Sequence, residues 1–299
     1  MRAAAEPLNN VAYVYDGTTE GLLSAVFQTY ALHEQPQDML REDMLQPRLG
    51  QSIRFVETDA ALAQRVKVGI CKRAGRSAWE AVLHASLSDD PQAPMAGYRF
   101  VRYVMARPAA SNRGLVHNLA HPIAGPVAKL SRSVMNERHL MQQFLRFEHF
   151  ENDIWFAQCN PKANVVPLLM DWFSGRFNNQ RFVIYDEVHH VAGIYDGSGW
   201  CLARTDEVHL PLHAEDEQLM QKAWKGFYDA VAIPARYHPE LWRHFMPKRF
   251  WKNILEVRDE ALGAGVGAGE LPPVSLAQAS SGQRDKLAGA KFANGVDAR

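Results

Sequence analysis

Cysteine is scarce in this sequence, and its three cysteines, Cys71, Cys159 and Cys201, stand far apart. No C-x-x-C pair occurs, so the sequence predicts neither a disulfide framework nor a thiolate zinc cluster. It also lacks the closely spaced cysteine triad that holds an iron–sulfur cluster. We therefore expect no resident metal and no cofactor. Isolated thiols fit a reducing compartment, and we expect a cytoplasmic protein.

Other absences remove whole classes of protein. No apolar stretch is long enough to span a bilayer, and none follows Arg2 as it would in a signal peptide, so we expect no membrane partner. There is no P-loop and no G-x-S-x-G elbow. The glycines of residues 263–269 alternate strictly and do not match a dinucleotide-binding fingerprint. We find no internal repeat.

What the sequence does have is enough apolar material for a large core. It is 47% hydrophobic and 22% charged, with 33 Lys and Arg against 33 Asp and Glu, so binding of nucleic acid would need a local basic patch. We expect residues 1–258 to form a single α+β domain or two lobes that meet near residue 120. Residues 259–299 are rich in Gly, Ala and Ser, which predicts a disordered tail.

The order of hydrophobic patterns predicts an α+β fold. Helices are expected to flank a central ββαβββ module at residues 144–205, whose short joins favour an antiparallel sheet. In the C-terminal helix after Glu215, an apolar stripe at helical spacing is expected to be buried. The expected strands of the module are residues 144–150, 154–157, 182–185, 191–195 and 200–203. The expected stripe is Leu219, Ala223, Trp224, Phe227 and Val231.

The segment Phe245–Trp251 combines two cations, a proline and three aromatic rings. Rings resist exposure and cations resist burial, so we expect the rings to point inward and Lys248 and Arg249 outward, where they would suit phosphate. Residues 222–252 carry seven cations and two acids, with rings between them. Trp251 would stack on a base. The other expected phosphate contacts are Lys225, Arg236 and Arg146. The plain alternative is an amphipathic turn packed on the core with solvated cations.

A second candidate is a hydrolytic metal site at the end of a strand. Asp186 and His190 would face one way on that strand and Glu187 and His189 the other, so each face offers one carboxylate and one imidazole. A hydrolytic metal usually needs three protein ligands, and Asp196 on the next strand is the candidate third. The alternative is an ordinary polar strand end.

Several of these segments resemble, in order, a bacterial family called "probable DNA metabolism protein". Tyr13–Thr18 and Glu20–Phe27 resemble the start of that family. Glu137–His139 and Gln143–Phe147 resemble its central signature, and Met246–Trp251 resembles its end. The resemblance covers about residues 10–257. Further matching positions are Pro161, Val166–Leu169, Arg176–Phe177, Ile184–Asp186, Trp224–Phe227, Ala232–Ile233, Arg236 and Pro239.

The resemblance implies a DNA repair context rather than a known reaction. The family is a domain of unknown function whose members accompany a putative DNA modification or repair radical SAM protein. Elsewhere a similar domain is fused to a uracil-DNA glycosylase-like domain, which this chain lacks. Relatives often carry arginine where this chain has His189 and His190, so a phosphate role for that strand is in doubt.

These observations favour a DNA-binding accessory component that works with a radical SAM protein in DNA repair or DNA metabolism. Two alternatives stay open. One is a metal-dependent nuclease or lyase that uses Asp186, Glu187, His189 and Asp196. The other is a non-catalytic adaptor for the radical SAM protein.

Overall fold

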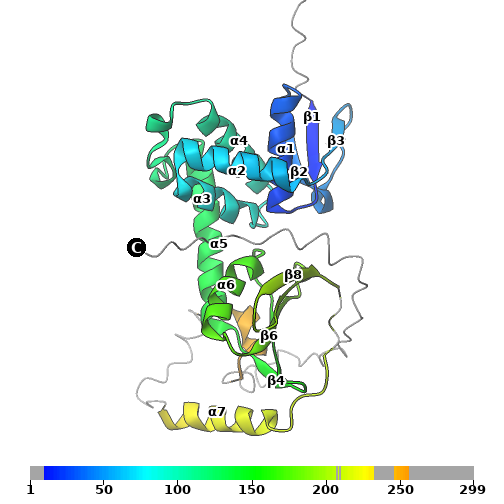
Figure 1. Cartoon of the computed structure of the whole chain (residues 1–299), viewed down its shortest axis with the longest axis vertical. Coiled ribbons are helices and arrows are strands. Elements are labelled where there is room, and N and C mark those ends of the chain that lie inside the picture. Colours follow the sequence, from blue (N-terminus) through cyan, green and yellow to red (C-terminus); the bar gives the residue numbers. More distant parts are fainter. Residues whose placement is uncertain (1–9, 207, 209, 232–245, 256–299) are drawn as a thin grey trace, which may run out of the picture. The chain divides into compact units, whose positions relative to one another are not determined.

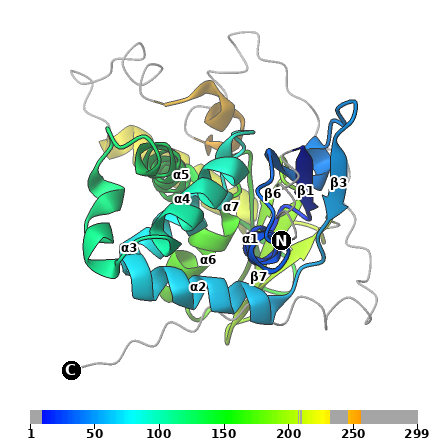
Figure 2. The same ribbon diagram turned by 90° about the horizontal axis from the view of Figure 1, so that it is seen from above.

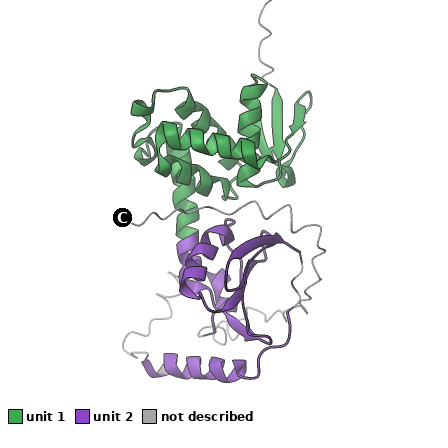
Figure 3. Cartoon of the chain, viewed as in Figure 1, with its two compact units in different colours: residues 1–137 green, residues 138–299 purple. Residues whose placement is uncertain are grey.

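Helices and two β-sheets make up the described part of the chain, which is residues 10–206, 208, 210–231 and 246–255 of a computed structural model. The α+β class expected from the sequence is confirmed. The chain divides into two units, residues 1–137 and 138–299, which are coloured separately in Figure 3. The division falls inside one helix, α5 (Ala124–Phe144). The tail expected at residues 259–299 lies outside the described residues.

Three parallel strands begin unit 1 in the order β2-β1-β3. They are β1 (Val11–Tyr15), β2 (Asp38–Arg41) and β3 (Ser52–Phe55). All five residues of β1 are buried, which explains its continuous apolar sequence. Helix α1 (Thr19–Ala31) connects β1 to β2, and its N-cap Thr18 accepts a hydrogen bond from the Gly21 N–H at 2.9 Å. Strand β2 was not predicted because it is short and polar at both ends.

Unit 1 continues as a group of helices. These are α2 (Ala60–Ala74), α3 (Arg76–Ser86), α4 (Ala93–Met105) and the start of α5, with short 3-10 turns η1 (Glu42–Met44), η2 (Ala109–Asn112) and η3 (Leu115–His117). Gly75, at φ +88°, separates α2 from α3 in a backbone conformation that favours glycine. Figure 1 and Figure 2 both show α2, α3 and α4 grouped beside the three strands. One apolar core joins these helices to the sheet.

Unit 2 is built on a five-stranded sheet of order β4-β5-β6-β7-β8. The antiparallel sheet expected from the sequence is wrong at one pair, because β5 and β6 run parallel in register from Ile154↔Arg181 to Cys159↔Asp186. Helix α6 lies between these two strands in the chain and acts as a crossover that returns the chain to the same edge. The elements are β4 (Glu148–Phe150), β5 (Ile154–Cys159), α6 (Val166–Arg176), β6 (Arg181–Asp186), β7 (Val191–Tyr195) and β8 (Trp200–Arg204).

Two C-terminal elements follow, α7 (Glu217–Val231) and the 3-10 helix η5 (Lys248–Asn253). Helix α7 is tied to β4 through its first residue, since the Glu217 carboxylate accepts from the His149 N–H at 2.8 Å. Its apolar stripe was expected to be buried, but Leu219 is 68% exposed and Phe227 57% exposed. Periodicity indicates that a helix has an apolar face, but it does not say what covers that face. No helix of the described residues is both long and apolar enough to cross a membrane.

Candidate functional site

The ring-and-cation segment predicted to bind phosphate lies on η5. Phe245 lies outside the described residues. The rings of Phe250 and Trp251 are buried, at 4% and 6% exposed, whereas Lys248 is exposed. Arg249 is half-buried, and its guanidinium carbon lies 4.8 Å from the centroid of the Phe250 ring. The backbone carbonyl of Arg249 accepts a hydrogen bond from the Asn160 side chain at 3.4 Å, which ties η5 to the loop after β5.

Trp251 does not have the exposure that base stacking requires. Its indole N–H donates to the carbonyl of Met246 at 3.2 Å, so both the ring and its polar atom are used inside the fold. The prediction that Trp251 stacks on a base is therefore wrong for this conformation. The structure agrees with the alternative interpretation of this segment, in which the ring of Trp251 packs on the core.

Of the remaining predicted phosphate contacts, Arg146 follows the end of α5, where the ring centroid of Phe144 lies 5.2 Å from that of Phe250 in η5. Arg146 donates to the carbonyls of Gln143 and Leu145 at 3.1 and 3.3 Å, where it satisfies the C-terminal end of α5. Lys225 is half-buried on α7. Arg236 lies outside the described residues.

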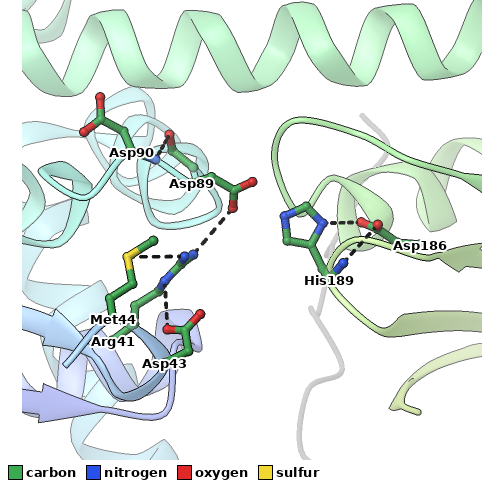
Figure 4. Close-up of polar contacts among 8 residues, drawn as sticks. Arg41, Asp43, Met44, Asp89, Asp90, Asp186 and His189 are labelled. Carbon is green, nitrogen blue, oxygen red and sulfur yellow. Dashed lines mark hydrogen bonds and ion pairs between the residues drawn. The ribbon is translucent and has the colours of Figure 1, made fainter. Parts of the chain in front are cut away.

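Asp186 is fully buried and paired with His189 (Figure 4). One carboxylate oxygen accepts from the N–H groups of Val188 and His189 at 2.9 and 3.2 Å, and the other lies 2.5 Å from the imidazole Nδ1 of His189. Strand alternation placed these two side chains on opposite faces. That placement is wrong because β6 ends at Asp186 and the chain turns through residues 187–190, with His190 at φ +54°.

The other two members of the predicted hydrolytic site lie apart from this pair. Glu187 accepts from the Gln158 side chain at 2.5 Å. Asp186 pairs with Val191 across the hairpin, whereas Asp196 follows the opposite end of β7, about 16 Å away at roughly 3.3 Å per residue. Asp196 therefore does not supply a third ligand. Among the described residues, no group of three or more His, Cys, Asp or Glu side chains could hold a metal ion.

Asp196 instead organises the turn between β7 and β8. Its carboxylate accepts from the Ser198 N–H and hydroxyl at 2.8 Å each and from the Gly199 N–H at 2.9 Å. These bonds, with that of Gly199 the largest contribution, lower the pKa of Asp196 from 3.8 to about 2.

We expect Asp196 to keep its charge down to a pH of about 2. Because the folded-state pKa is depressed, its contribution to stability is present above pH 3.8 and is lost as the pH falls through about 2. Carboxyl NMR titration measures this directly. Ser198→Ala removes the hydroxyl donor and should move the pKa back toward its ordinary value. A wild-type midpoint near 3.8 would contradict the turn geometry.

A polar group that the sequence did not reveal lies at the carboxyl end of the parallel sheet in unit 1. Arg41, at the end of β2, forms ion pairs with Asp43 at 3.4 Å and Asp89 at 3.6 Å (Figure 4). The hydroxyl of Tyr15, at the end of β1, is buried without a hydrogen-bond partner among the described residues, and burial raises its pKa. In open parallel sheets, ligands bind at this edge. Here the edge carries three carboxylates, those of Asp16, Asp43 and Asp89, and their negative charge makes it unfavourable for phosphate.

The second feature that the sequence analysis missed is a basic helical layer, which we define as residues 60–136 of unit 1. This stretch has eleven Lys and Arg residues and three acids, which gives a net charge of +8. Residues 10–59 have three Lys and Arg residues and eight acids, which gives a net charge of −5. The available signal was the absence of any acid from residue 91 to residue 136. The exposed cations of the layer are Arg65, Lys72, Arg73, Arg76, Arg99, Arg113, Lys129 and Arg132, and the half-buried ones are Lys67, Arg102 and Arg107.

Comparison with known proteins places the chain in a family without assigning it an activity. No curated protein matches the chain. A family model described as a domain of unknown function, DUF4130, matches residues 91–256, which is more than half of the sequence. The matched segment contains residues 91–136 of the basic helical layer, the five-stranded sheet, α7 and η5. The chain therefore belongs to the DUF4130 family.

Proposed function

We propose that the protein is a DNA-binding accessory component of DNA repair or DNA metabolism. The observation that carries the proposal is the basic helical layer, whose three acids cannot neutralise eleven cations. The chain as a whole is neutral, so this local excess of charge is a concentrated feature of unit 1. Such an excess on helices suits a polyanion with closely spaced charges, which is what the DNA backbone offers.

Several cations of the layer are held against aromatic rings, which favours phosphate binding further. Arg65 lies 4.8 Å from the Phe27 ring centroid, Lys67 5.1 Å from that of Trp79 and Arg102 4.6 Å from that of Tyr30. A long side chain that is already restrained loses less conformational freedom when it contacts a phosphate.

The cations predicted from the sequence form a second set in unit 2. Exposed Lys248 is its strongest member, and Arg249, Lys225 and Arg146 are weaker members because each is half-buried. Arg236 belongs to the set only by sequence. The resemblance described above supports the DNA repair context and the partnership with a radical SAM protein, and no contact surface for that partner follows from it.

An adaptor role is the second candidate. Helix α7 exposes Leu219, Met220, Trp224, Phe227, Tyr228 and Val231, and an exposed apolar face of this kind is typical of a protein-binding surface. The radical SAM protein of the same system is the occupant that we propose for it. The nuclease or lyase alternative is weaker, because the carboxylate of Asp186 is fully buried and already used by His189 and two backbone N–H groups.

Binding of duplex DNA at a series of salt concentrations tests the proposal. Each lost phosphate contact reduces the slope of log affinity against log salt by about 0.7 to 0.9. We expect the double variant Lys129→Ala with Arg132→Ala to flatten the slope by about 1.4 to 1.8, nearly equally for all DNA sequences. Lys248→Ala with Arg249→Ala should do the same if the set in unit 2 also contacts DNA.

Arg48→Ala with Arg176→Ala is the matched control, because it removes two exposed cations from outside both sets. Equal losses in the control and in the layer variant would show a nonspecific charge effect and contradict the proposal. A wild-type protein that binds no DNA at low salt, but co-purifies with the radical SAM protein, would replace DNA binding with the adaptor role.

A further inference from the structure

Arg107 follows α4 and is held in an unusual way for a surface arginine. Its Nη1 donates to the hydroxyl oxygen of Tyr103 at 2.6 Å, and its guanidinium carbon lies 4.8 Å from the centroid of the Tyr103 ring. Its Nε is buried and has no hydrogen-bond partner within the described residues. The contact with Tyr103 therefore fixes the orientation of the guanidinium.

The hydroxyl of Tyr103 also has a donor to offer. Nδ1 of His121 accepts from the N–H groups of Ile123 and Ala124 at 3.1 Å each, so the ring proton resides on Nε2. That Nε2 lies 3.1 Å from the Tyr103 hydroxyl oxygen and donates to it. The oxygen thus accepts from both Arg107 and His121, and its own hydrogen points to a third partner.

A second arginine is brought to the same place by Asn112, which is 1% exposed. The Asn112 amide donates to the carbonyls of Arg73 at 3.2 Å and Val104 at 2.9 Å, which joins the end of α2 to the end of α4. The guanidinium of Arg73 then donates to the carbonyl of Arg107 at 3.1 Å. The guanidinium of Arg73, in α2, is therefore held against the backbone of Arg107, which follows α4.

No carboxylate of the neighbouring sequence balances these two charges. The flanking residues Lys72, Arg76 and Arg113 are also cationic, and the nearest acid along α3, Glu80, pairs with Arg76 at 2.9 Å. An anion that contacts both guanidinium groups would reduce the repulsion between them. The group presents only donors, and a phosphate presents only acceptors, so the two are complementary.

We propose that Arg73, Tyr103 and Arg107 bind one phosphate of a nucleic acid backbone. The site deepens the proposed function and rests on it, because it locates one contact within the basic helical layer. Arg73 and Arg107 donate charge-assisted hydrogen bonds to the phosphate oxygens, and the Tyr103 hydroxyl donates a neutral one. His121 is a positioning residue that holds the tyrosine hydroxyl.

The test uses two variants of the full chain with duplex DNA. Tyr103→Phe keeps the ring under Arg107 and removes one neutral donor, so affinity should fall roughly 3- to 10-fold with the salt slope unchanged. Arg73→Gln removes an exposed charge and should flatten the slope by about 0.7 to 0.9. Tyr30→Phe is the matched control, because Tyr30 is also a tyrosine beneath an arginine, Arg102, and it should bind like wild type.

The outcomes separate this inference from the proposed function. A wild-type protein that binds DNA with a clear salt slope, while Tyr103→Phe and Arg73→Gln match it, overturns the site and leaves the function standing. A wild-type protein that binds no DNA overturns both. Thermal stabilisation by inorganic phosphate at matched ionic strength, lost in Tyr103→Phe but without any DNA binding, would show a free phosphate as the ligand and overturn the nucleic-acid source.

Discussion

Trp251→Ala is expected to lower the free energy of unfolding by about 3–5 kcal/mol, as truncation of a large buried aromatic residue does. The ring is 6% exposed and its N–H bonds to the carbonyl of Met246, so truncation leaves both a cavity and an unpaired carbonyl. Urea unfolding followed by circular dichroism measures the change. Any loss of DNA affinity should follow the loss of folded protein.

Trp224→Ala is the matched control, because Trp224 is 44% exposed on α7. Its truncation should change stability by less than about 1 kcal/mol. If Trp251→Ala instead unfolds at the wild-type urea concentration and weakens DNA binding with an unchanged salt slope, Trp251 is a base-stacking residue and its packing described here is wrong.

Asp186→Ala is expected to cost about 3–5 kcal/mol of stability, because each donor left without its acceptor inside a fold costs about 1–3 kcal/mol. The change leaves two backbone N–H groups and the imidazole of His189 without their acceptor inside the fold. Thermal and urea unfolding of the variant both measure the loss.

Asp206→Ala removes a comparable but exposed pair, because Asp206 is 92% exposed and lies 3.6 Å from His190. Surface pairs contribute about 0–1 kcal/mol, so this control should unfold almost like wild type. A different result would favour the enzyme alternative. In that case Asp186→Ala would keep its stability but lose a metal ion that the wild-type protein holds stoichiometrically.

Local signals in the sequence predict the elements of this fold better than their pairing. Alternation and turn residues predicted strands on either side of α6, but the first strand begins at Glu148 and not at Phe144, which is the last residue of α5. They did not predict that β5 and β6 are parallel, because that depends on the path of the crossover. The exposed face of α7 was missed for a related reason, since its apolar spacing is the same whether or not another element covers it.

For the candidate sites too, the sequence predicted local features but not the contacts made by the tertiary structure. The mixture of rings and cations in residues 245–251 predicted a boundary segment, but only the tertiary structure shows that Trp251 is inside and Lys248 outside. The contact between Tyr103 and His121 joins residues that no local motif connects. The basic helical layer has no motif either, because its cations are spread over four helices and the segments between them. Its sequence signals are a net charge of +8 and a long stretch without acids.

The segment that defines the family does not coincide with a folding unit. The match begins at residue 91, just before α4, yet Phe100 and Val104 of that helix are fully buried in the core of unit 1. Their core includes residues from β1, α1 and α2, all before residue 91. A fragment cut to the matched residues would expose this face of α4 to water and would be prone to aggregate. Any longer protein that carries the segment must therefore supply α4 with an apolar cover.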